Sequence, residues 1–519
     1  MMTTNLLPMI KRLLFLSLLI IFACDSSQKL TTTSADDGII EFVFIHANDV
    51  YEITPLSGGK SGGLARVATV REELLAENKN TLTVHAGDFL NPSLIGTIKM
   101  DGERIKGRQM VEVMNEVGFD LVTFGNHEFD LKENELQARM NESNFEWTTC
   151  NTFQVSGDRN YPFYKEVDGR KHFSPHTYTW EITDADGTNI KVGIFGVTLS
   201  VNQKDYVHYD DFYKSADQAV KDLTASTDVV IGLTHLDIEQ DLEVARRHPS
   251  VPLFMGGHDH HHMMHKVGSS VVAKADANVR TIYIHRVTYN KKTKSSTVKS
   301  ELKVIDDSIA NHPKVQKVVD KWNTILMANL GDIINEPNKI LMFAEEPLDG
   351  RESSIRIQQT NLGTLIVKSF YLASENVDAA LMNSGSIRID DEIQGNVTAL
   401  DFFRALPFGG KVITVELTGT LLNQLLETSL AKIGKGAYLQ LYKINKETDG
   451  KWIVGGSPLD ETKTYRIAMS AFMLSGYDYP FFTRENKGIL NIEEPDMQDE
   501  SDHRRDLRMS IVHYLMNRK

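Results

Sequence analysis

Residues 125–130 read Gly-Asn-His-Glu-Phe-Asp and directly follow Leu121 to Phe124, a short apolar run of the kind that forms a buried strand. The turn therefore carries Asn126, His127 and Asp130, three side chains that can bind metal or exchange protons, within a few residues of a strand end. In open α/β sheets, side chains at the carboxyl ends of strands line one crevice. This stretch predicts a layered α/β domain with a polar site at the edge of its sheet.

The same pattern recurs from about residue 40 to 300, where short β-branched runs alternate with helical patterns. The expected strands are Ile40 to Ile45, Thr81 to His85, Leu121 to Phe124, Lys191 to Val197, Val229 to Leu233 and Val251 to Met255. Five of the six are followed within a few residues by Asp, Asn or His: Asn48-Asp49, Gly87-Asp88, Gly125-Asn126-His127, Thr234-His235 and Gly256-Gly257-His258-Asp259-His260. We expect these five segments to meet in one crevice.

Carboxylate, amide and imidazole groups of this kind are hard or borderline ligands, which suit divalent zinc, manganese, iron or cobalt and not a thiolate site. One carboxylate can bridge two such ions, and a pair about 3.5 to 4 Å apart can generate hydroxide and hold a phosphoryl group. A single histidine after a strand is more often a packing residue. Five polar segments in succession indicate a metal centre.

The composition restricts the function further. The 519 residues are enough for two or more domains, and 41% of them are hydrophobic. The formal net charge of −14 repels polyanions, so general nucleic-acid binding is not expected. The two cysteines, Cys24 and Cys150, are too few for a disulfide framework.

The first 24 residues resemble an export signal, with Lys11-Arg12 before the apolar run from Leu13 to Cys24. That run is too short to span a bilayer, which needs about 20 residues. Its end, Ile21-Phe22-Ala23-Cys24, resembles a bacterial lipobox, whose cysteine carries lipid after cleavage; an ordinary cleaved signal is the alternative. We expect an exported protein, periplasmic or at the cell surface, that touches the membrane only through Cys24.

A second unit follows the first. A helix from Pro313 to Asn329 has one apolar face and serves as a connector. Beyond it, residues 339–519 combine helices such as Thr418 to Ile433 with strand-like runs at Ala379 to Met382, Val412 to Leu417, Tyr438 to Tyr442 and Tyr465 to Met469. We therefore expect a signal or lipobox at 1–24, a first domain at 25–312, a connector at 313–338 and an α+β domain at 339–519.

Together these motifs resemble a known family. The five segments of the first domain are similar to the successive motifs of calcineurin-like metallophosphatases. In the second unit, Asn383 to Arg388, Leu406 to Gly410 and Phe472 to Tyr479 resemble the 5′-nucleotidase C-terminal domain, and Gly62 to Arg66 resembles an early segment of that family. The resemblance covers nearly all of the mature chain. It implies a two-domain α/β (α+β) fold: a four-layer β-sandwich flanked by helices, a connector helix and a smaller C-terminal domain.

The resemblance also implies two divalent metal ions. Asp49, Asp88 and His260 would hold one, and Asp88, Asn126, His235 and His258 the other, so that Asp88 bridges. One residue departs from the pattern: Tyr51 stands where the family has histidine. It could ligate as phenolate, which favours a trivalent ion such as ferric iron, or turn away and leave a water-filled position. We favour the second, because ionising an ordinary phenol near neutral pH is costly.

His127 and Asp130 are three residues apart, so the carboxylate can accept a hydrogen bond from the imidazole and fix its tautomer. A cationic His127 could then protonate a leaving alkoxide. In the resembled family this pair is the catalytic dyad, and the nucleophile is a metal-bound hydroxide. The alternative is an ordinary surface pair at a helix start.

For the substrate, the resemblance implies that two phenylalanines, Phe408 and Phe472, stack on a nucleotide base while Asp478 binds the ribose. Arg356 and Arg388 would bind the anionic end, and Asn383 would lie beside the base. The alternative makes the two rings core residues and the arginines surface charges. Tyr477 and Tyr479, and likewise Ser384 and Ser386, replace glycines of the family pattern.

The sequence thus predicts a monomeric hydrolase that releases phosphate from nucleoside 5′-monophosphates. A phosphodiesterase for 2′,3′-cyclic nucleotides or nucleotide sugars is the enzymatic alternative. The non-enzymatic alternative is a catalytically weakened surface protein that binds nucleotide or metal without turnover.

Overall fold

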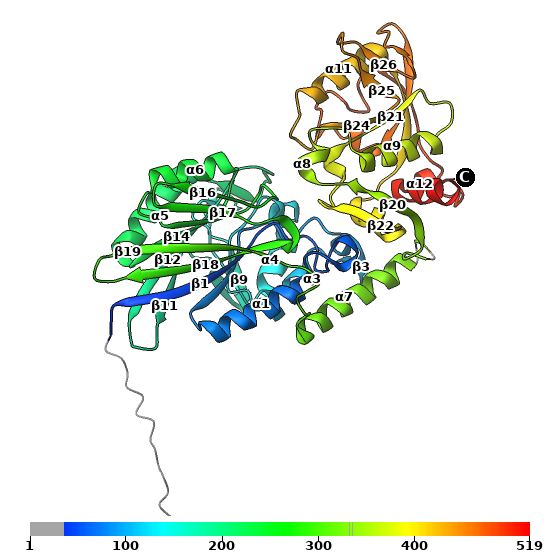
Figure 1. Ribbon diagram of the computed structural model, residues 1–519. Coiled ribbons are helices and arrows are strands. Elements are labelled where there is room, and N and C mark those ends of the chain that lie inside the picture. The colour runs from blue at the N-terminus through cyan, green and yellow to red at the C-terminus, as the bar shows by residue number, and fades with distance from the viewer. Residues whose placement is uncertain (1–35, 332, 335, 519) are drawn as a thin grey trace, which may run out of the picture.

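The computed structural model of the protein describes residues 36–331, 333–334 and 336–518. This part of the chain forms two lobes joined by the long helix α7 (Pro313–Gly331), as Figure 1 shows. The export segment predicted at 1–24, with Cys24, lies outside the described residues. Within the described ranges, no helix is both long and apolar enough to span a bilayer.

Two six-stranded sheets form the N-terminal domain. The first has the order β19-β18-β1-β2-β5-β6, with β1 (Ile39–Ala47), β2 (Thr81–His85), β5 (Leu121–Val122), β6 (Glu146–Trp147), β18 (Thr281–Asn290) and β19 (Ser295–Val304). The second has the order β11-β12-β14-β15-β17-β16, with β11 (Thr177–Thr183), β12 (Asn189–Thr198), β14 (Val229–His235), β15 (Leu253–Gly256), β16 (Met263–Val267) and β17 (Ser270–Lys274). All six predicted strands are present.

Alternation along β1 shows how the layers form. Phe42 and Phe44 point into the core between the two sheets, whereas Val43 and Ile45 pack into the helical layer on the other side. Helices on the outer faces are α1 (Leu64–Glu77), α3 (Arg108–Val117) and α4 (Glu133–Glu142) over the first sheet, and α5 (Phe212–Ser226) and α6 (Ile238–Arg247) over the second. The predicted four-layer sandwich is confirmed.

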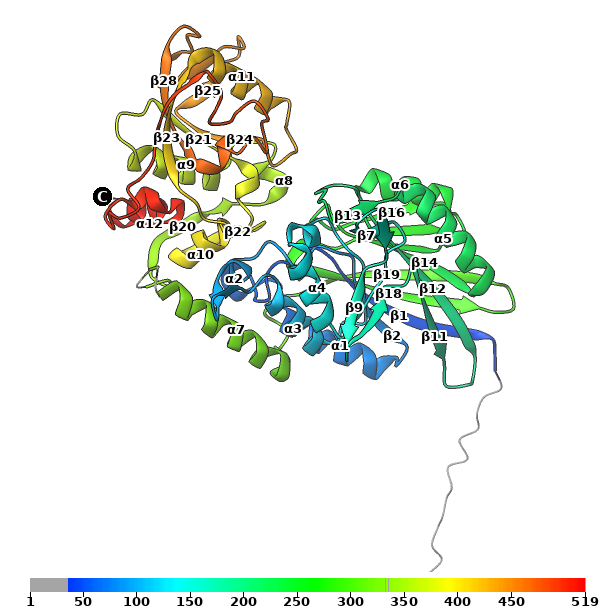
Figure 2. The same cartoon turned by 180° about the vertical axis from the view of Figure 1, so that it is seen from behind.

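The connector helix α7 packs on the N-terminal domain. Its buried residues Val315, Val319, Trp322 and Leu326 belong to the same core cluster as α1 and α3. The Trp322 indole donates to Glu112 Oε2 at 3.1 Å. Figure 2 shows α7 running along this domain toward the second lobe. The helix therefore fixes where the chain enters the C-terminal domain.

A five-stranded sheet organises the C-terminal domain, in the order β24-β21-β28-β23-β29. Its strands are β21 (Ala379–Asn383), β23 (Val412–Thr418), β24 (Leu439–Tyr442), β28 (Thr464–Ser470) and β29 (Ile489–Glu493), and β20 (Ile340–Asp349) pairs with β22 (Glu392–Thr398) beside it. The helices are α8 (Glu352–Ile355), α9 (Asn361–Ala373), α10 (Ala399–Ala405), α11 (Gly419–Leu430) and α12 (Leu507–Met516). Separate cores on the two faces of the sheet, one with α9 and α12 and one with α11, confirm the expected α+β domain.

Candidate metal centre and substrate cleft

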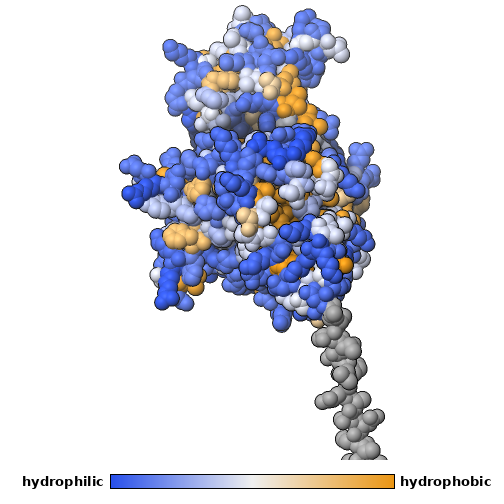
Figure 3. Space-filling model, turned by 90° about the vertical axis from the view of Figure 1, so that its left-hand side faces the viewer, coloured by the Kyte–Doolittle hydropathy of each residue, from blue (hydrophilic) through white to orange (hydrophobic). Residues whose placement is uncertain are grey.

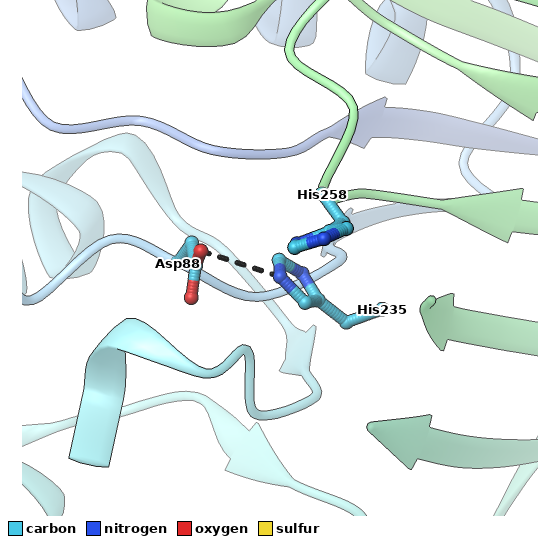
Figure 4. Close-up of side chains that lie close together, drawn as sticks. All are labelled: Asp88, His235 and His258. Atoms are coloured by element: carbon cyan, nitrogen blue, oxygen red, sulfur yellow. Dashed lines mark ion pairs between the residues drawn. The ribbon is translucent and has the colours of Figure 1, made fainter. Parts of the chain in front are cut away.

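The loops after β2 and β15 and the last residue of β14 bring three predicted ligands together. Asp88, His235 and His258 offer ligand atoms that all lie within 4.8 Å of one another, and their side chains point toward one another in Figure 4. His235 Nε2 lies 3.2 Å from Asp88 Oδ2 and 3.3 Å from Asn126 Oδ1. The structure therefore brings together all four side chains expected at the second metal position.

The first metal position gathers Asp49, Asp88 and His260, again with ligand atoms within 4.8 Å of one another. His260 Nε2 faces Asp49 Oδ1 at 3.4 Å. Asp49 Oδ1 is buried without a hydrogen-bond partner, as expected of an oxygen that binds a cation. Carboxylate, amide and imidazole donors around one bridging aspartate fit divalent ions.

Tyr51 does not turn away from the site, so the favoured expectation for this residue was wrong. The ring is buried, with 4% of the residue exposed, and its hydroxyl donates to Asp88 Oδ2 at 3.2 Å and lies 3.0 Å from His260 Nε2. Burial raises the pKa of Tyr51, and the Asp88 and Asp49 carboxylates raise it further. Burial and the two carboxylates thus favour the neutral phenol, and its oxygen lies among the predicted ligands of the first position.

Backbone conformation makes these contacts possible. Asp49, Asp88, His258 and His260 all adopt positive φ angles, which turn the chain sharply after a strand. At Gly125 a Cβ atom would stand 2.1 Å from Asp88 Oδ1, so only glycine fits. The His235 Nδ1 donates to the Ala86 carbonyl at 2.7 Å, which leaves Nε2 free to face the site.

Glu128 ties two of the loops together. Its fully buried carboxylate accepts hydrogen bonds from the backbone N–H groups of Asp88, Phe89, Leu90 and Gly125 at 2.7 to 3.1 Å. Burial, with the nearby Asp88, raises its pKa to about 7. The residue therefore shapes the loops without facing the cleft.

His127 and Asp130 are paired as their spacing predicts, within a short 3-10 turn. His127 Nδ1 donates to Asp130 Oδ2 at 2.6 Å. Asn91 also donates to Asp130 Oδ2, at 2.8 Å, and Asn202 donates to Asp130 Oδ1 at 3.0 Å. Burial raises the pKa of Asp130, but His127 outweighs this effect and leaves the pKa below its usual value. The carboxylate is thus held ionised as an acceptor for His127.

A buried lysine supports the histidine loops. Lys274, on β17, is fully buried; its ammonium donates to the Leu236 carbonyl at 2.6 Å and pairs with Asp259 at 2.5 Å and Asp241 at 2.8 Å. Burial lowers the pKa of Lys274, but the two carboxylates raise it more. Because Leu236 follows His235, and Asp259 lies between His258 and His260, one ammonium anchors both loops.

The aspartates and histidines of the site shift the pKa values of one another because they lie close together. Burial lowers the pKa of His235, yet Asp88 raises it to about 9, and Asp49 and Asp390 do the same for His260. The same contact with His260 lowers the pKa of Asp49 to about 2, against the effect of burial. The carboxylates at this site are therefore ionised, as metal ligands must be.

A cleft of about 1440 Å³ extends from this centre to the C-terminal domain. Its walls include every residue predicted to bind substrate: Arg356, Asn383, Arg388, Phe408, Phe472 and Asp478. Phe408 and Phe472 are 56% and 44% exposed, so the alternative that they are core residues was wrong. Figure 3 shows a largely hydrophilic surface where the lobes meet. The cleft thus has two exposed aromatic rings on its walls.

The arginines occupy distinct places in this cleft. Arg388 Nη2 lies 3.1 Å from His127 Nε2, across the domain boundary. Arg356 is paired with Glu352, and burial together with Arg388 lowers its pKa to about 10, so it remains a cation. Asp478 has one buried oxygen without a hydrogen-bond partner, and burial raises its pKa. Positive charge therefore stands next to the His127–Asp130 pair.

Several residues that support the site were not predicted from the sequence. Asn202 follows β12, the one predicted strand after which no polar site residue was expected. Its position just beyond a strand end could have indicated that it lies at the site. Lys274 gave no signal, because a lysine in a strand is normally exposed. Glu352 and Asp390 contact His260 from the C-terminal domain, and no local pattern in the sequence shows that contact.

Both domains of the chain are similar to known proteins. A model of calcineurin-like phosphoesterases matches residues 42–262, and one of the 5′-nucleotidase C-terminal domain matches residues 340–484. The trifunctional nucleotide phosphoesterase YfkN of Bacillus subtilis is 25% identical to this chain over 87% of this chain's residues. The match covers only 33% of the length of YfkN. The 5′-nucleotidase of Bos taurus is 24% identical over 84% of this chain and 83% of its own length.

Among solved structures, a 5′-nucleotidase precursor from Thermus thermophilus has the same fold, with a TM-score of 0.71 and 22% identity over 92% of this chain and 96% of its own. Fold and site together define a metal-dependent phosphoric ester hydrolase with a calcineurin-like catalytic domain. The chain belongs to the 5′-nucleotidase family, in which that domain is joined to a 5′-nucleotidase C-terminal domain.

Proposed function

We propose that the protein releases phosphate from nucleoside 5′-monophosphates bound in the cleft between its domains. The observation that carries the proposal is the contact of Arg388 Nη2 with His127 Nε2 at 3.1 Å. A group that binds the anionic end of a nucleotide thereby stands beside a group that can transfer a proton. The names of the relatives, 5′-nucleotidase and nucleotide phosphoesterase, support the same substrate class.

Each residue has a role in this proposal. Phe408 and Phe472 stack on the base from both sides, and Asp478 accepts hydrogen bonds from ribose hydroxyls. Asn383 lies beside the base. Arg356 and Arg388 bind the phosphate through charge-assisted hydrogen bonds.

Hydrolysis takes place at the other end of the cleft. His127, oriented by Asp130 at Nδ1, donates a proton from Nε2 to the leaving ribose oxygen when the imidazole is cationic, with Arg388 then turned from Nε2 to the phosphate. Asp49, Asp88 and His260 would hold one divalent ion, and Asp88, Asn126, His235 and His258 would hold a second. When bound, such ions polarise the phosphate and lower the pKa of a water molecule.

A substrate panel tests the proposal. Full-length protein reconstituted with zinc, manganese or ferrous iron is assayed for phosphate release from AMP, UMP, ADP, UDP-glucose and 2′,3′-cyclic AMP. The expected result is that kcat/KM is highest for the monophosphates, and that His258→Ala abolishes turnover. His265→Ala is the matched control, because this histidine on β16 is exposed and lies outside the cleft. No phosphate release from a monophosphate with any of the three metals would contradict the proposal.

A second activity is favoured by the size of the cleft. Its volume of about 1440 Å³ exceeds the roughly 300 to 1000 Å³ of common small-molecule sites, so a nucleotide sugar or cyclic nucleotide also has room. Lys432 and Lys435 on its wall add positive charge for a second phosphate. Product analysis with UDP-glucose and 2′,3′-cyclic AMP in the same panel decides between phosphatase and phosphodiesterase action.

The division of the chain and its location belong to the same proposal. We place the domain boundaries at 25–312, 313–338 and 339–519, with 1–24 as a signal that leaves Cys24 lipidated. The mature protein would then be a membrane-anchored monomer. Fractionation of cells that carry Cys24→Ala tests the anchor, since loss of lipid should move the protein from the membrane pellet to the soluble fraction.

A further inference from the structure

His260 is held from the C-terminal domain. Its Nδ1 lies 3.0 Å from Asp390 Oδ2 and 2.9 Å from Glu352 Oε2. Glu352 begins α8, and Asp390 follows the substrate-binding Arg388 by two residues. The side chains of His260, Glu352 and Asp390 are only 13%, 19% and 7% exposed. The contact therefore crosses the domain boundary and is shielded from water.

The two ring nitrogens of His260 face different partners. Nε2 faces Asp49 Oδ1 at 3.4 Å, on the side of the first metal position. Nδ1 faces two carboxylates, both from the C-terminal domain. An imidazole that binds metal through one nitrogen keeps a proton on the other, and a carboxylate that accepts this proton fixes the tautomer and the ring orientation. Two such acceptors, Glu352 and Asp390, lie beside Nδ1 of His260.

Both carboxylates are themselves held in place. Asp390 Oδ1 accepts from the Glu352 N–H at 2.8 Å, which leaves Oδ2 for His260. Glu352 Oε1 pairs with Arg356, which leaves Oε2 for His260. Arg280 of the N-terminal domain donates to the Asp390 carbonyl at 2.9 Å. Each acceptor therefore points one oxygen at Nδ1 and uses the other elsewhere.

We propose that Glu352 and Asp390 are positioning residues for the first metal position: the C-terminal domain orients His260 and so sets the affinity of that position for its ion. The inference rests on the proposed role of His260 as a ligand. It gives the C-terminal domain a part in holding metal, in addition to its part in binding nucleotide.

Metal titration of the full chain tests the proposal. Dissociation constants for zinc and manganese at both positions are measured by calorimetry and chelator competition in Glu352→Gln, Asp390→Asn and the double variant. Loss of such an outer partner typically weakens binding about 10- to 100-fold, and we expect this at the first position only. The control is Asp391→Asn, because Asp391 also crosses the boundary, to Ser57 at 2.9 Å, but does not contact His260.

The outcomes separate the two proposals. If the double variant binds both ions like the parent while His260→Ala loses the first, the positioning role is wrong and the ligand assignment stands. If His260→Ala also binds both ions normally, the ligand assignment itself fails, and the positioning role fails with it. An equal loss in Asp391→Asn would show that general disturbance of the domain contact is responsible, which also contradicts the proposal.

A spectroscopic readout distinguishes orientation from mere folding. In the cobalt-substituted protein, the Nδ1 proton of a bound His260 should give a strongly shifted, exchangeable proton signal that His260→Ala lacks. The neutral amide oxygens of the double variant are weaker acceptors than the two carboxylates, so this proton should exchange with solvent faster and its signal should broaden. An unchanged exchange rate would overturn the proposal.

Discussion

Removal of the aromatic pair in the cleft should weaken nucleotide turnover without weakening the fold. Phe408 and Phe472 are 56% and 44% exposed, so Phe→Ala at either position leaves no buried cavity and little change in the free energy of unfolding. Stacking of a base on an aromatic ring contributes roughly 1 to 3 kcal/mol. Since a tenfold change in rate corresponds to about 1.4 kcal/mol, each substitution should lower kcat/KM for AMP roughly 5- to 140-fold.

The assay compares AMP with ribose 5-phosphate, which has the same phosphate and sugar but no base. Parent, Phe408→Ala, Phe472→Ala and the double variant are measured with both substrates at saturating metal. The loss should fall on AMP and mainly on KM, while ribose 5-phosphate is hydrolysed equally by all four proteins. An equal loss for both substrates, or unchanged kcat/KM for AMP, would refute the stacking role.

Four further results are expected. His127→Ala should lower kcat by about 10² to 10⁴ with unchanged metal content by elemental analysis; unchanged kcat would remove this residue from catalysis. Tyr51→His should tighten metal binding at the first position in chelator competition, and equal affinity would show that the phenol costs nothing there. Lys274→Met leaves two carboxylates without their buried partner and should lower the free energy of unfolding by about 3 to 5 kcal/mol in urea, whereas the surface variant Lys299→Met should not. Burial lowers the pKa of His85 from 6.5 to about 3, so the folded protein loses stability as the pH falls below about 6.5. At pH 5, which is 1.5 units lower, the loss in the free energy of unfolding is about 2 kcal/mol. His85→Leu should abolish this part of the pH dependence.

The strands and their polar ends could be predicted because both signals are local. Apolar runs such as Thr81 to His85 mark a strand wherever it packs, and the chain itself places Asp88 just beyond it. The orientation of Tyr51 could not be predicted, because rotation of one side chain depends on which atoms fill the space around it. Its hydroxyl finds Asp88 and His260, which are 37 and 209 residues away in sequence.

The support of the site was also beyond prediction. Lys274 is buried only because two carboxylates from other elements reach its ammonium. Asp390 meets His260 across 130 residues and a domain boundary. Such contacts follow from how finished domains pack, which composition and periodicity do not encode.

The main chain at position 51 is held by contacts that are separate from those of the Tyr51 side chain. Asn278 Oδ1 accepts from the backbone N–H groups of Tyr51 and Glu52 at 2.9 and 3.1 Å. Neither bond depends on which residue stands at position 51. The loop can therefore keep its conformation with a different side chain at position 51. A change in the metal preference of such an enzyme then requires no change in its scaffold.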